Sequence, residues 1–290
     1  MKELVVISGK GGTGKTTITA SFASLAENKV MCDCDVDAAN LFLLLNPTIL
    51  EEEEIRFSKV ANINEEECNK CGICEENCRF KAISDFKVDP IKCEGCGVCE
   101  LVCPLDAISL ESFTSGKIFT TTTKYGPFFY AKLNPGAGNT GRLATEIRNR
   151  AFNLANENGS DLVIIDGSPG IGCPVIASIT GTDIALVVTE PTLSGEHDLE
   201  RIIKLTEYFR VKTFVCINKF DINPEITKRI EKYCQSKGHM VAGKIPYNPV
   251  VTEAMTKGFP VVEFVDNEVT DEIKKIWGLL LKEVVSPEEL

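Results

Sequence analysis

The first eighteen residues, MKELVVISGKGGTGKTTI, place an apolar segment directly before a glycine-rich turn that carries two lysines. The apolar residues 4–8 predict a buried parallel strand, and residues 18–26 predict a helix whose N-terminus faces an anion. The spacing of Gly9, Gly14, Lys15 and Thr16 matches the P-loop pattern, in which glycines allow backbone N–H groups to surround phosphate. We therefore expect an α/β fold that binds a nucleotide, with Lys15 at the β- and γ-phosphates and the Thr16 hydroxyl on Mg²⁺.

A second feature is a dense group of cysteines. Eight of the thirteen cysteines lie in one short segment, at positions Cys68, Cys71, Cys74, Cys78, Cys93, Cys96, Cys99 and Cys103. This is the spacing of bacterial ferredoxins with two 4Fe-4S clusters, in which three close cysteines bind one cluster and the fourth binds the other. The rule assigns one cluster to Cys68, Cys71, Cys74 and Cys103, and the other cluster to Cys78, Cys93, Cys96 and Cys99.

The cysteine segment is also an internal repeat with a constant offset. The corresponding pairs include Cys68 and Cys93, Gly72 and Gly97, Cys78 and Cys103, and Ile83 and Ile108. The first copy has Arg79 where the second has Pro104, a difference that removes no ligand. Duplication of one half-site therefore accounts for the two cluster sites.

Zinc is the competing metal, since C-x2-C pairs also form zinc ribbons. Runs of three cysteines at this spacing plus a fourth suit a closed tetrahedral zinc site poorly, and this favours the clusters. Disulfides are less expected, because the N-terminus has no apolar signal segment and the P-loop indicates the reducing, ATP-rich cytosol. We expect a cytoplasmic protein.

Composition excludes some partners. The chain of 290 residues has a formal net charge of −11, which argues against nucleic acid as the main partner because phosphate backbones require a basic surface. No apolar run is long enough to span a bilayer. Residues 51–54 are four consecutive glutamates, and we interpret them as a solvated linker rather than a binding tail.

The length suits one large α/β domain with a small module inserted in it. Residues 1–58 and 113–290 are predicted to form the nucleotide domain, and residues 59–112 the inserted cluster domain. Short apolar strands are expected at 162–166, 184–189, 212–217 and 240–245, with helical stretches between them. This alternation gives a mostly parallel sheet covered by helices. Residues 119–133 are rich in β-branched and aromatic side chains and should add strand structure.

Acidic residues follow two of these strands, where an open α/β sheet binds its ligands. Asp33, Asp35 and Asp37 lie in MCDCDVDAAN, and Asp166 lies in LVIIDGSPGIG. A solvated loop is the alternative interpretation of the three alternate carboxylates.

The segment KGGTGKTT resembles the deviant P-loop of the MinD, Mrp and nitrogenase iron protein superfamily. The resemblance covers essentially the whole chain, and it points to those members that carry an inserted two-cluster ferredoxin domain and occur in anaerobic bacteria and archaea. It implies an ATP-dependent homodimer in which Lys10 reaches the partner's nucleotide. The implied ATP- and Mg²⁺-binding residues of the loop are Gly9, Lys10, Gly11, Gly12, Thr13, Gly14, Lys15, Thr16 and Thr17.

The same resemblance assigns roles beyond the loop. Asp35 would position the attacking water, which makes Lys10, Lys15 and Asp35 the catalytic set. Asp33 or Asp37 would hold a Mg²⁺-bound water, and Asp166 would also act on Mg²⁺ from outside its first layer of ligands. The adenine base would contact Asn218, Pro246 and Tyr247. Asn218, Lys219 and Asp221 also match the N-K-x-D pattern of GTPases, so GTP stays an alternative to ATP.

Cys173 lies where the nitrogenase iron protein carries a cluster ligand in switch II, so it is a candidate additional thiol. A small buried cysteine is the competing interpretation. The sequence shows no partner cysteine for it and lacks the C-terminal C-x-x-C of Mrp-type carriers. His197 and His239 are isolated and are expected to be structural.

The C-terminal residues Ile273, Ile276, Trp277, Leu280 and Leu281 have helical apolar spacing, and the tail ends Pro287, Glu288, Glu289 before the last residue. The acidic end favours packing of this helix on the domain over membrane contact.

The expected function is that of an ATP-switched iron–sulfur protein that assists assembly or maturation of a metal cluster on a client protein. The alternatives are an ATP-gated electron donor to a partner oxidoreductase, and a MinD-like positioning ATPase whose clusters sense redox state. The implied cofactors are ATP, Mg²⁺ and two 4Fe-4S clusters. The implied partners are a second copy of the chain and an iron–sulfur or redox client.

Overall fold

The computed structural model describes residues 1–135 and 137–284, which divide into two compact units. The first unit comprises Met1–Glu51, Phe119–Ala131 and the described chain from Thr140 onward. The second comprises Glu52–Ile118 and the described part of 132–139. The domain limits expected at residues 58 and 113 stay a prediction.

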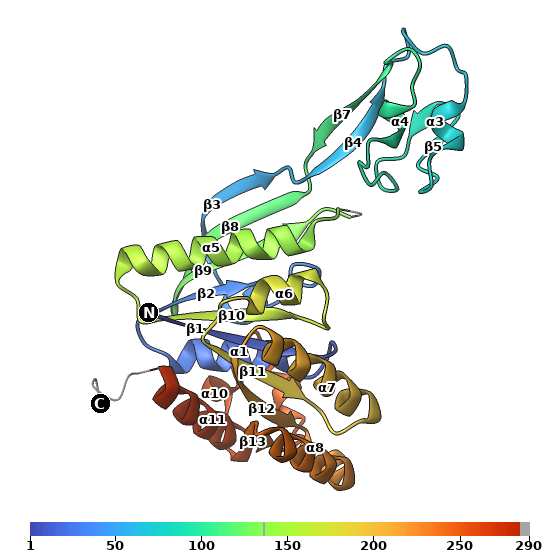
Figure 1. Ribbon diagram of the computed structural model, residues 1–290. Helices are drawn as coiled ribbons and strands as arrows, with labels where there is room; N and C mark the ends of the chain where they lie inside the picture. Colours follow the sequence, from blue (N-terminus) through green and yellow to red (C-terminus); the bar gives the residue numbers. More distant parts are fainter. Residues whose placement is uncertain (136, 285–290) are drawn as a thin grey trace. The chain divides into compact units, whose positions relative to one another are not determined.

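A parallel sheet forms the centre of the first unit (Figure 1). Its strand order is β13-β12-β11-β1-β10-β2, and every neighbouring pair runs parallel. The strands are β1 (Lys2–Ser8), β2 (Lys29–Asp33), β10 (Leu162–Pro169), β11 (Ile184–Thr189), β12 (Lys212–Asn218) and β13 (Met240–Ile245). Most residues of β1, β2, β10, β11 and β12 are buried, as expected for strands covered on both faces. The predicted mostly parallel α/β sheet is confirmed.

Three more strands extend the hydrogen-bonded order beyond β2, namely β9 (Gly126–Leu133), β8 (Gly116–Thr123) and β3 (Thr48–Ile55). β8 and β9 confirm the strand structure predicted over 119–133. The linker predicted at 51–54 is wrong, because Glu51, Glu52, Glu53 and Glu54 lie inside β3. Their side chains are nevertheless exposed, since β3 is the last strand of the order, and Glu52 pairs with Lys117 of β8. Charged residues at a sheet edge discourage further strand pairing.

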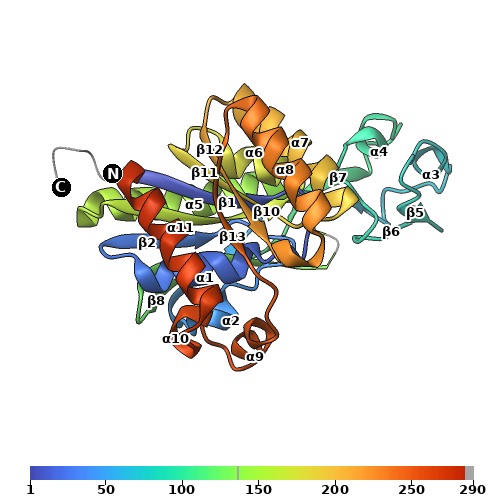
Figure 2. The same cartoon turned by 90° about the horizontal axis from the view of Figure 1, so that it is seen from below.

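Helices cover both faces of the parallel sheet (Figure 2). One face carries α5 (Thr140–Asn158), α6 (Cys173–Ile179), α7 (Leu193–Tyr208) and α8 (Pro224–Lys237). The other carries α1 (Lys15–Leu25), α9 (Val250–Thr256), α10 (Val261–Phe264) and α11 (Glu268–Val284). The short elements α2 (Phe42–Leu45) and η1 (Phe220–Ile222) complete the unit.

Helix α11 packs its apolar stripe into the core, as its spacing predicted. Ile273, Ile276, Trp277 and Leu280 are buried, and Trp277 packs its ring 5.1 Å from that of Phe22 in α1. Leu281 differs from the prediction, because it is exposed. No helix in residues 1–135 or 137–284 is long and apolar enough to cross a membrane. Pro287, Glu288 and Glu289 lie outside the described residues.

The second unit contains two copies of one small motif. β4 (Ser58–Ile63) pairs antiparallel with β7 (Ile108–Phe113), and β5 (Ile83–Ser84) pairs antiparallel with β6 (Lys87–Val88). The one-turn helices α3 (Ile73–Glu76) and α4 (Val98–Leu101) each follow a left-handed glycine, Gly72 with φ 83° and Gly97 with φ 78°. A left-handed conformation is one that glycine adopts without strain. The sequence repeat is therefore also a repeat of backbone conformation.

Candidate functional site

The glycine-rich turn connects β1 to α1 and wraps the start of that helix. Gly14 caps α1 with φ 92°, and a Cβ atom there would meet the side-chain amide of Asn218 at 2.3 Å. Glycine is therefore required both for the left-handed backbone and for the close approach of β12. Thr13 has a buried hydroxyl with no hydrogen-bond partner, which leaves an unsatisfied polar atom inside the loop. The N–H groups at the start of a helix bind anions, and the Thr13 hydroxyl is available to donate a hydrogen bond to one. The loop therefore has the features of an anion site.

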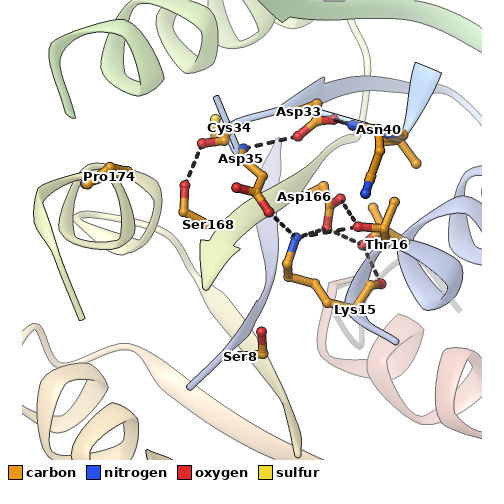
Figure 3. A network of polar contacts seen from close by, with 12 residues as sticks. Ser8, Lys15, Thr16, Asp33, Cys34, Asp35, Asn40, Asp166, Ser168 and Pro174 are labelled. Carbon is orange, nitrogen blue, oxygen red and sulfur yellow. Dashed lines mark hydrogen bonds and ion pairs between the residues drawn. The ribbon is translucent and has the colours of Figure 1, made fainter. Parts of the chain in front are cut away.

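Lys15 is buried at the centre of a carboxylate network (Figure 3). Its Nζ atom lies 3.1 Å from Asp166 Oδ1 and 3.2 Å from Asp35 Oδ2. The hydroxyl of Thr16 donates to Asp166 Oδ2 at 2.8 Å. Burial alone would lower the pKa of Lys15, but the charges of Asp166, Asp35 and Asp33 outweigh it and the pKa is raised. Lys15 is thus held as a cation between two strand ends.

Asp33 is fully buried, and its carboxylate accepts hydrogen bonds from backbone N–H groups of Asp35 and Leu41 at 3.0 and 3.1 Å. Burial and the charge of Asp166 raise the pKa of Asp33 to about 8. Asp37 is exposed, so of the two carboxylates expected to serve Mg²⁺ only Asp33 lies in the network. The hydroxyl of Ser168 donates to Cys34 O at 2.7 Å and connects the end of β10 to the residue that follows β2 (Figure 3).

Lys10 lies at the outer side of the loop and contacts residues of its own chain. Its Nζ atom lies 2.6 Å from Glu190 Oε1 and 3.1 Å from the hydroxyls of Thr192 and Ser194. Lys219 approaches the other oxygen of Glu190 at 3.3 Å. Glu190 was not among the expected site residues. It directly follows β11, and this position at the carboxyl end of a parallel strand is the sequence feature that could have indicated it.

A cavity of about 340 Å³ extends from the loop toward β13 and α11. Asn218, Pro246 and Tyr247, the residues expected at the adenine base, line it, and their contact with a base stays a prediction. The side-chain amide of Asn218 donates to Thr13 O at 2.8 Å. This hydrogen bond connects the end of β12, where the base is expected, to the glycine-rich loop, where the phosphates are expected. The sequence did not indicate several other apolar residues of this wall, namely Val251, Met255, Val269 and Ile273.

Asp221 is exposed, and one of its two carboxylate oxygens has a partner. Its Oδ1 atom accepts a hydrogen bond from the backbone N–H of Tyr247 at 2.7 Å. The residue that gave the GTPase-like match therefore anchors the loop after β13, and its carboxylate keeps capacity for further hydrogen bonds. GTP stays an alternative to ATP.

Cys173 begins α6 and is exposed. It lines an open groove with Gly141, Arg142 and Thr145 of α5. Cys32 and Cys34 are fully buried with sulfur atoms 3.9 Å apart, and Cys216 and Cys234 are also buried. The expectation that Cys173 has no thiol partner of its own stays a prediction.

The eight clustered cysteines line two separate small cavities of the second unit. The first quartet consists of Cys68, Cys71, Cys74 and Cys103, and the second quartet consists of Cys78, Cys93, Cys96 and Cys99. Each quartet joins three close cysteines with one from the other copy of the repeat. In residues 1–135 and 137–284, no group of three or more His, Cys, Asp or Glu residues is arranged to hold a single metal ion.

Neither histidine lines the nucleotide-site cavity or a quartet cavity. His239 Nε2 is 3.0 Å from Glu207 Oε1, and the side chain of His197 is mostly exposed beside Asp198. Both placements agree with structural or surface roles.

Comparison with known proteins gives a family match over most of the chain. Residues 4–261 match the CobQ/CobB/MinD/ParA nucleotide binding domain. An uncharacterised protein of Methanocaldococcus jannaschii is 39% identical over 76% of this chain and 79% of its own length. The chloroplastic MinD homolog of Arabidopsis thaliana is 27% identical over 89% of this chain and 68% of its own length. The MinD of Pyrococcus horikoshii complexed with Mg-ADP has a TM-score of 0.59 at 16% identity, covering 97% of this chain and 96% of that one.

Proposed function

The chain belongs to the CobQ/CobB/MinD/ParA nucleotide-binding family, and from this premise we propose that it is a MgATP-switched homodimer that carries two 4Fe-4S clusters and donates electrons to a partner oxidoreductase. ATP binding and the MinD/ParA-like ATPase fold follow from the family. The clusters, the dimer and the partner are the proposed part. The observation that carries the proposal is the combination, in one chain, of the Lys15 network with two separate cysteine quartets.

Residues of the nucleotide site have groups suited to different roles in ATP hydrolysis. Lys15 forms ion pairs with Asp35 and Asp166 in the structure, and the negatively charged oxygens of a bound triphosphate would compete with these carboxylates for it. A shift of Lys15 toward the phosphates would free Asp35 to position an attacking water. Thr16 and the carboxylates of Asp33 and Asp166 suit Mg²⁺, which prefers oxygen ligands and retains several waters. The ion would neutralise charge on the transferring phosphoryl group.

The quartets fit 4Fe-4S clusters in ligand type and number. Each supplies four thiols around a small cavity with apolar neighbours such as Ile73, Ala107 and Ile108 in the first and Ala61, Ile83 and Leu110 in the second. Backbone N–H groups point at some of the sulfurs, and such hydrogen bonds stabilise the thiolate form. The clusters would supply one-electron transfer at low potential.

Electron donation is favoured over cluster transfer by the number of ligands. With four protein thiols for each cluster, no coordination position is left for a client's ligand. Cluster assembly or maturation, the function that the sequence suggested first, is the second candidate. The exposed thiol of Cys173 in its groove favours it. A membrane-positioning role has less support, because α11 buries its apolar stripe in the core.

The test is an iron count with anaerobic electron paramagnetic resonance of the reduced protein, with and without MgATP. A nucleotide-dependent change in potential or line shape with all iron retained would support electron donation. Unchanged spectra, with loss of iron to an apo-acceptor after ATP addition, would support the maturation role. A protein that binds ATP and contains no iron would refute both iron–sulfur functions.

A further inference from the structure

The two cysteine quartets lie in two copies of one repeat, so their surroundings can be compared position by position. Under the proposed function each quartet holds a 4Fe-4S cluster, and the inference about the two potentials rests on that function. The potential of such a cluster rises with hydrogen bonds to its sulfurs and with nearby positive charge, because both stabilise the added electron. The repeat makes the differences between the copies visible.

The quartets differ in the hydrogen bonds that they accept. In the second quartet, the backbone N–H of Ala82 donates to Cys78 Sγ at 3.3 Å, and that of Ala61 donates to Cys93 Sγ at 3.5 Å. In the first quartet, the N–H of Ala107 donates to Cys103 Sγ at 3.3 Å, which matches the Ala82 bond. Within the part of the chain that the structure describes, the first quartet has no counterpart of the Ala61 bond. The additional hydrogen bond therefore favours a higher reduction potential for a cluster on the second quartet.

Charges beside the crossing cysteines differ in the same direction. Cys78 of the second quartet is followed by Arg79 and Lys81, whereas Cys103 of the first quartet is followed by Pro104 and then Asp106. Lys81 and Asp106 are both exposed, and both have a φ of 51°. The two positions are equivalent in backbone conformation and opposite in charge. The cationic pair favours reduction beside the second quartet, and Asp106 disfavours it beside the first.

The residues before each group of three cysteines add to the difference. Glu65, Glu66 and Glu67 precede the first group, whereas their counterparts 90–92 contain a single charged residue, Lys92, which pairs with Asp89 at 3.3 Å. Two differences within the loops oppose this trend, since Lys70 corresponds to a glycine and Glu94 corresponds to an asparagine. The surroundings of the first quartet are nevertheless acidic overall, and those of the second are close to neutral.

We propose that the two sites are unequal electron acceptors and that the second quartet holds the cluster that is reduced first. An electron on a cluster held by the first quartet would transfer to an oxidised cluster held by the second quartet. The first cluster would be oxidised by one electron and the second cluster reduced by one electron. No bond is formed or broken and no proton is transferred. We expect an equilibrium constant of at least about tenfold for this transfer, which corresponds to about 59 mV for a one-electron couple.

The experiment is a redox titration of the full-length holoprotein, followed by electron paramagnetic resonance with dithionite as reductant. The variants are Lys81→Asp and Asp106→Lys, which exchange the charges of two exposed positions with the same φ, so the backbone suits either residue. Lys81→Arg is the matched control, because it keeps the charge. Iron content is measured first for every protein, and about eight iron atoms per chain are expected for two intact clusters.

The wild-type protein and the control should titrate in two separate waves. Lys81→Asp should lower the higher-potential wave alone, Asp106→Lys should raise the lower-potential wave alone, and high salt should narrow the gap by screening. A single shared wave, or movement of the lower wave by Lys81→Asp, would overturn the inference while leaving the proposed function intact. A wild-type chain without iron would instead overturn the proposed function, and the inference with it.

Discussion

Lys10 and Glu190 form an ion pair within one chain, with 2.6 Å between Nζ and Oε1. The resemblance of the P-loop implies that Lys10 serves the nucleotide of a partner chain, and a lysine held by Glu190 is turned toward its own chain instead. Burial alone would raise the pKa of Glu190, but Lys10 and Lys219 hold that pKa below its ordinary value. Glu190 is therefore charged at neutral pH and keeps Lys10 in place.

Replacing Glu190 by glutamine should make dimer formation easier. Glu190→Gln keeps the shape of the side chain and removes the charge that holds Lys10, so we expect half-maximal dimerisation at a several-fold lower MgATP concentration. Sedimentation velocity at a series of ATP concentrations measures this. Lys10→Ala is the control and should not dimerise. A Glu190→Gln protein that needs more ATP than wild type would show that Glu190 supports the dimer.

The same ion pair should make stability depend on pH in a defined direction. A carboxylate whose pKa is lowered in the folded state contributes stability at neutral pH, and this contribution is lost as the pH falls through its folded pKa. At pH 7 we expect Glu190→Gln to lower the free energy of unfolding by about 1 kcal/mol. The difference from wild type should begin to shrink only below the ordinary glutamate pKa of about 4.3 and should vanish once the pH has fallen through the lowered pKa of Glu190. Urea denaturation of both proteins from pH 7 down into the acid range is the measurement, and a difference that grows in acid would contradict the assignment.

Loss of the Lys15 amine should greatly weaken nucleotide binding. Lys15→Ala removes the cation between Asp35 and Asp166 and leaves their carboxylates facing a triphosphate, so ATP affinity should fall at least about 100-fold, or ~2.7 kcal/mol. Isothermal titration calorimetry with MgATP tests this. Lys232→Ala changes an exposed lysine of α8 and is the control. Near-normal affinity in Lys15→Ala would remove Lys15 from the phosphate site.

The base preference should depend on the anchor that Asp221 provides. Asp221→Ala leaves the N–H of Tyr247 without its acceptor, so we expect ATP affinity to fall several-fold with no gain in GTP affinity. Competition binding with both nucleotides on the variant and wild type is the measurement. If wild type binds GTP better than ATP and Asp221→Ala loses only GTP, Asp221 reads guanine and the ATP assignment fails.

The two quartets should lose their iron independently. Cys71→Ser in the first quartet and Cys96→Ser in the second should each lower the iron content by about half, since each removes one ligand of one cluster. Cys173→Ser should leave the iron content unchanged, because Cys173 lines neither quartet cavity. Iron and zinc are counted on anaerobically purified proteins. Full iron in Cys71→Ser would contradict the role of Cys71 as a cluster ligand, and zinc in place of iron would identify the competing metal.

Local features were predictable wherever covalent spacing controls them. The P-loop needs a strand, glycines, a lysine and a helix in one order, and all of them lie within a few residues of Lys15. The apolar strands were recognisable because strands buried on both faces have continuous apolar runs. The prediction of a solvated linker at glutamates 51–54 was wrong, because the side chains of an edge strand can stay in solvent while its backbone forms hydrogen bonds with the neighbouring strand. A charge run therefore does not by itself exclude a strand.

The sequence by itself determined the nucleotide loop and the α/β class, since these depend on residues close together in the chain, and the repeat with its constant offset predicted the division of eight cysteines into two quartets. Only the tertiary structure decided that Asp33 lies in the carboxylate network while Asp37 is exposed, and that Glu190 and Asp221 are engaged with Lys10 and Tyr247. These contacts join residues far apart in the chain. The order of strands in the sheet brings them together, and spacing along the sequence carries no record of that order.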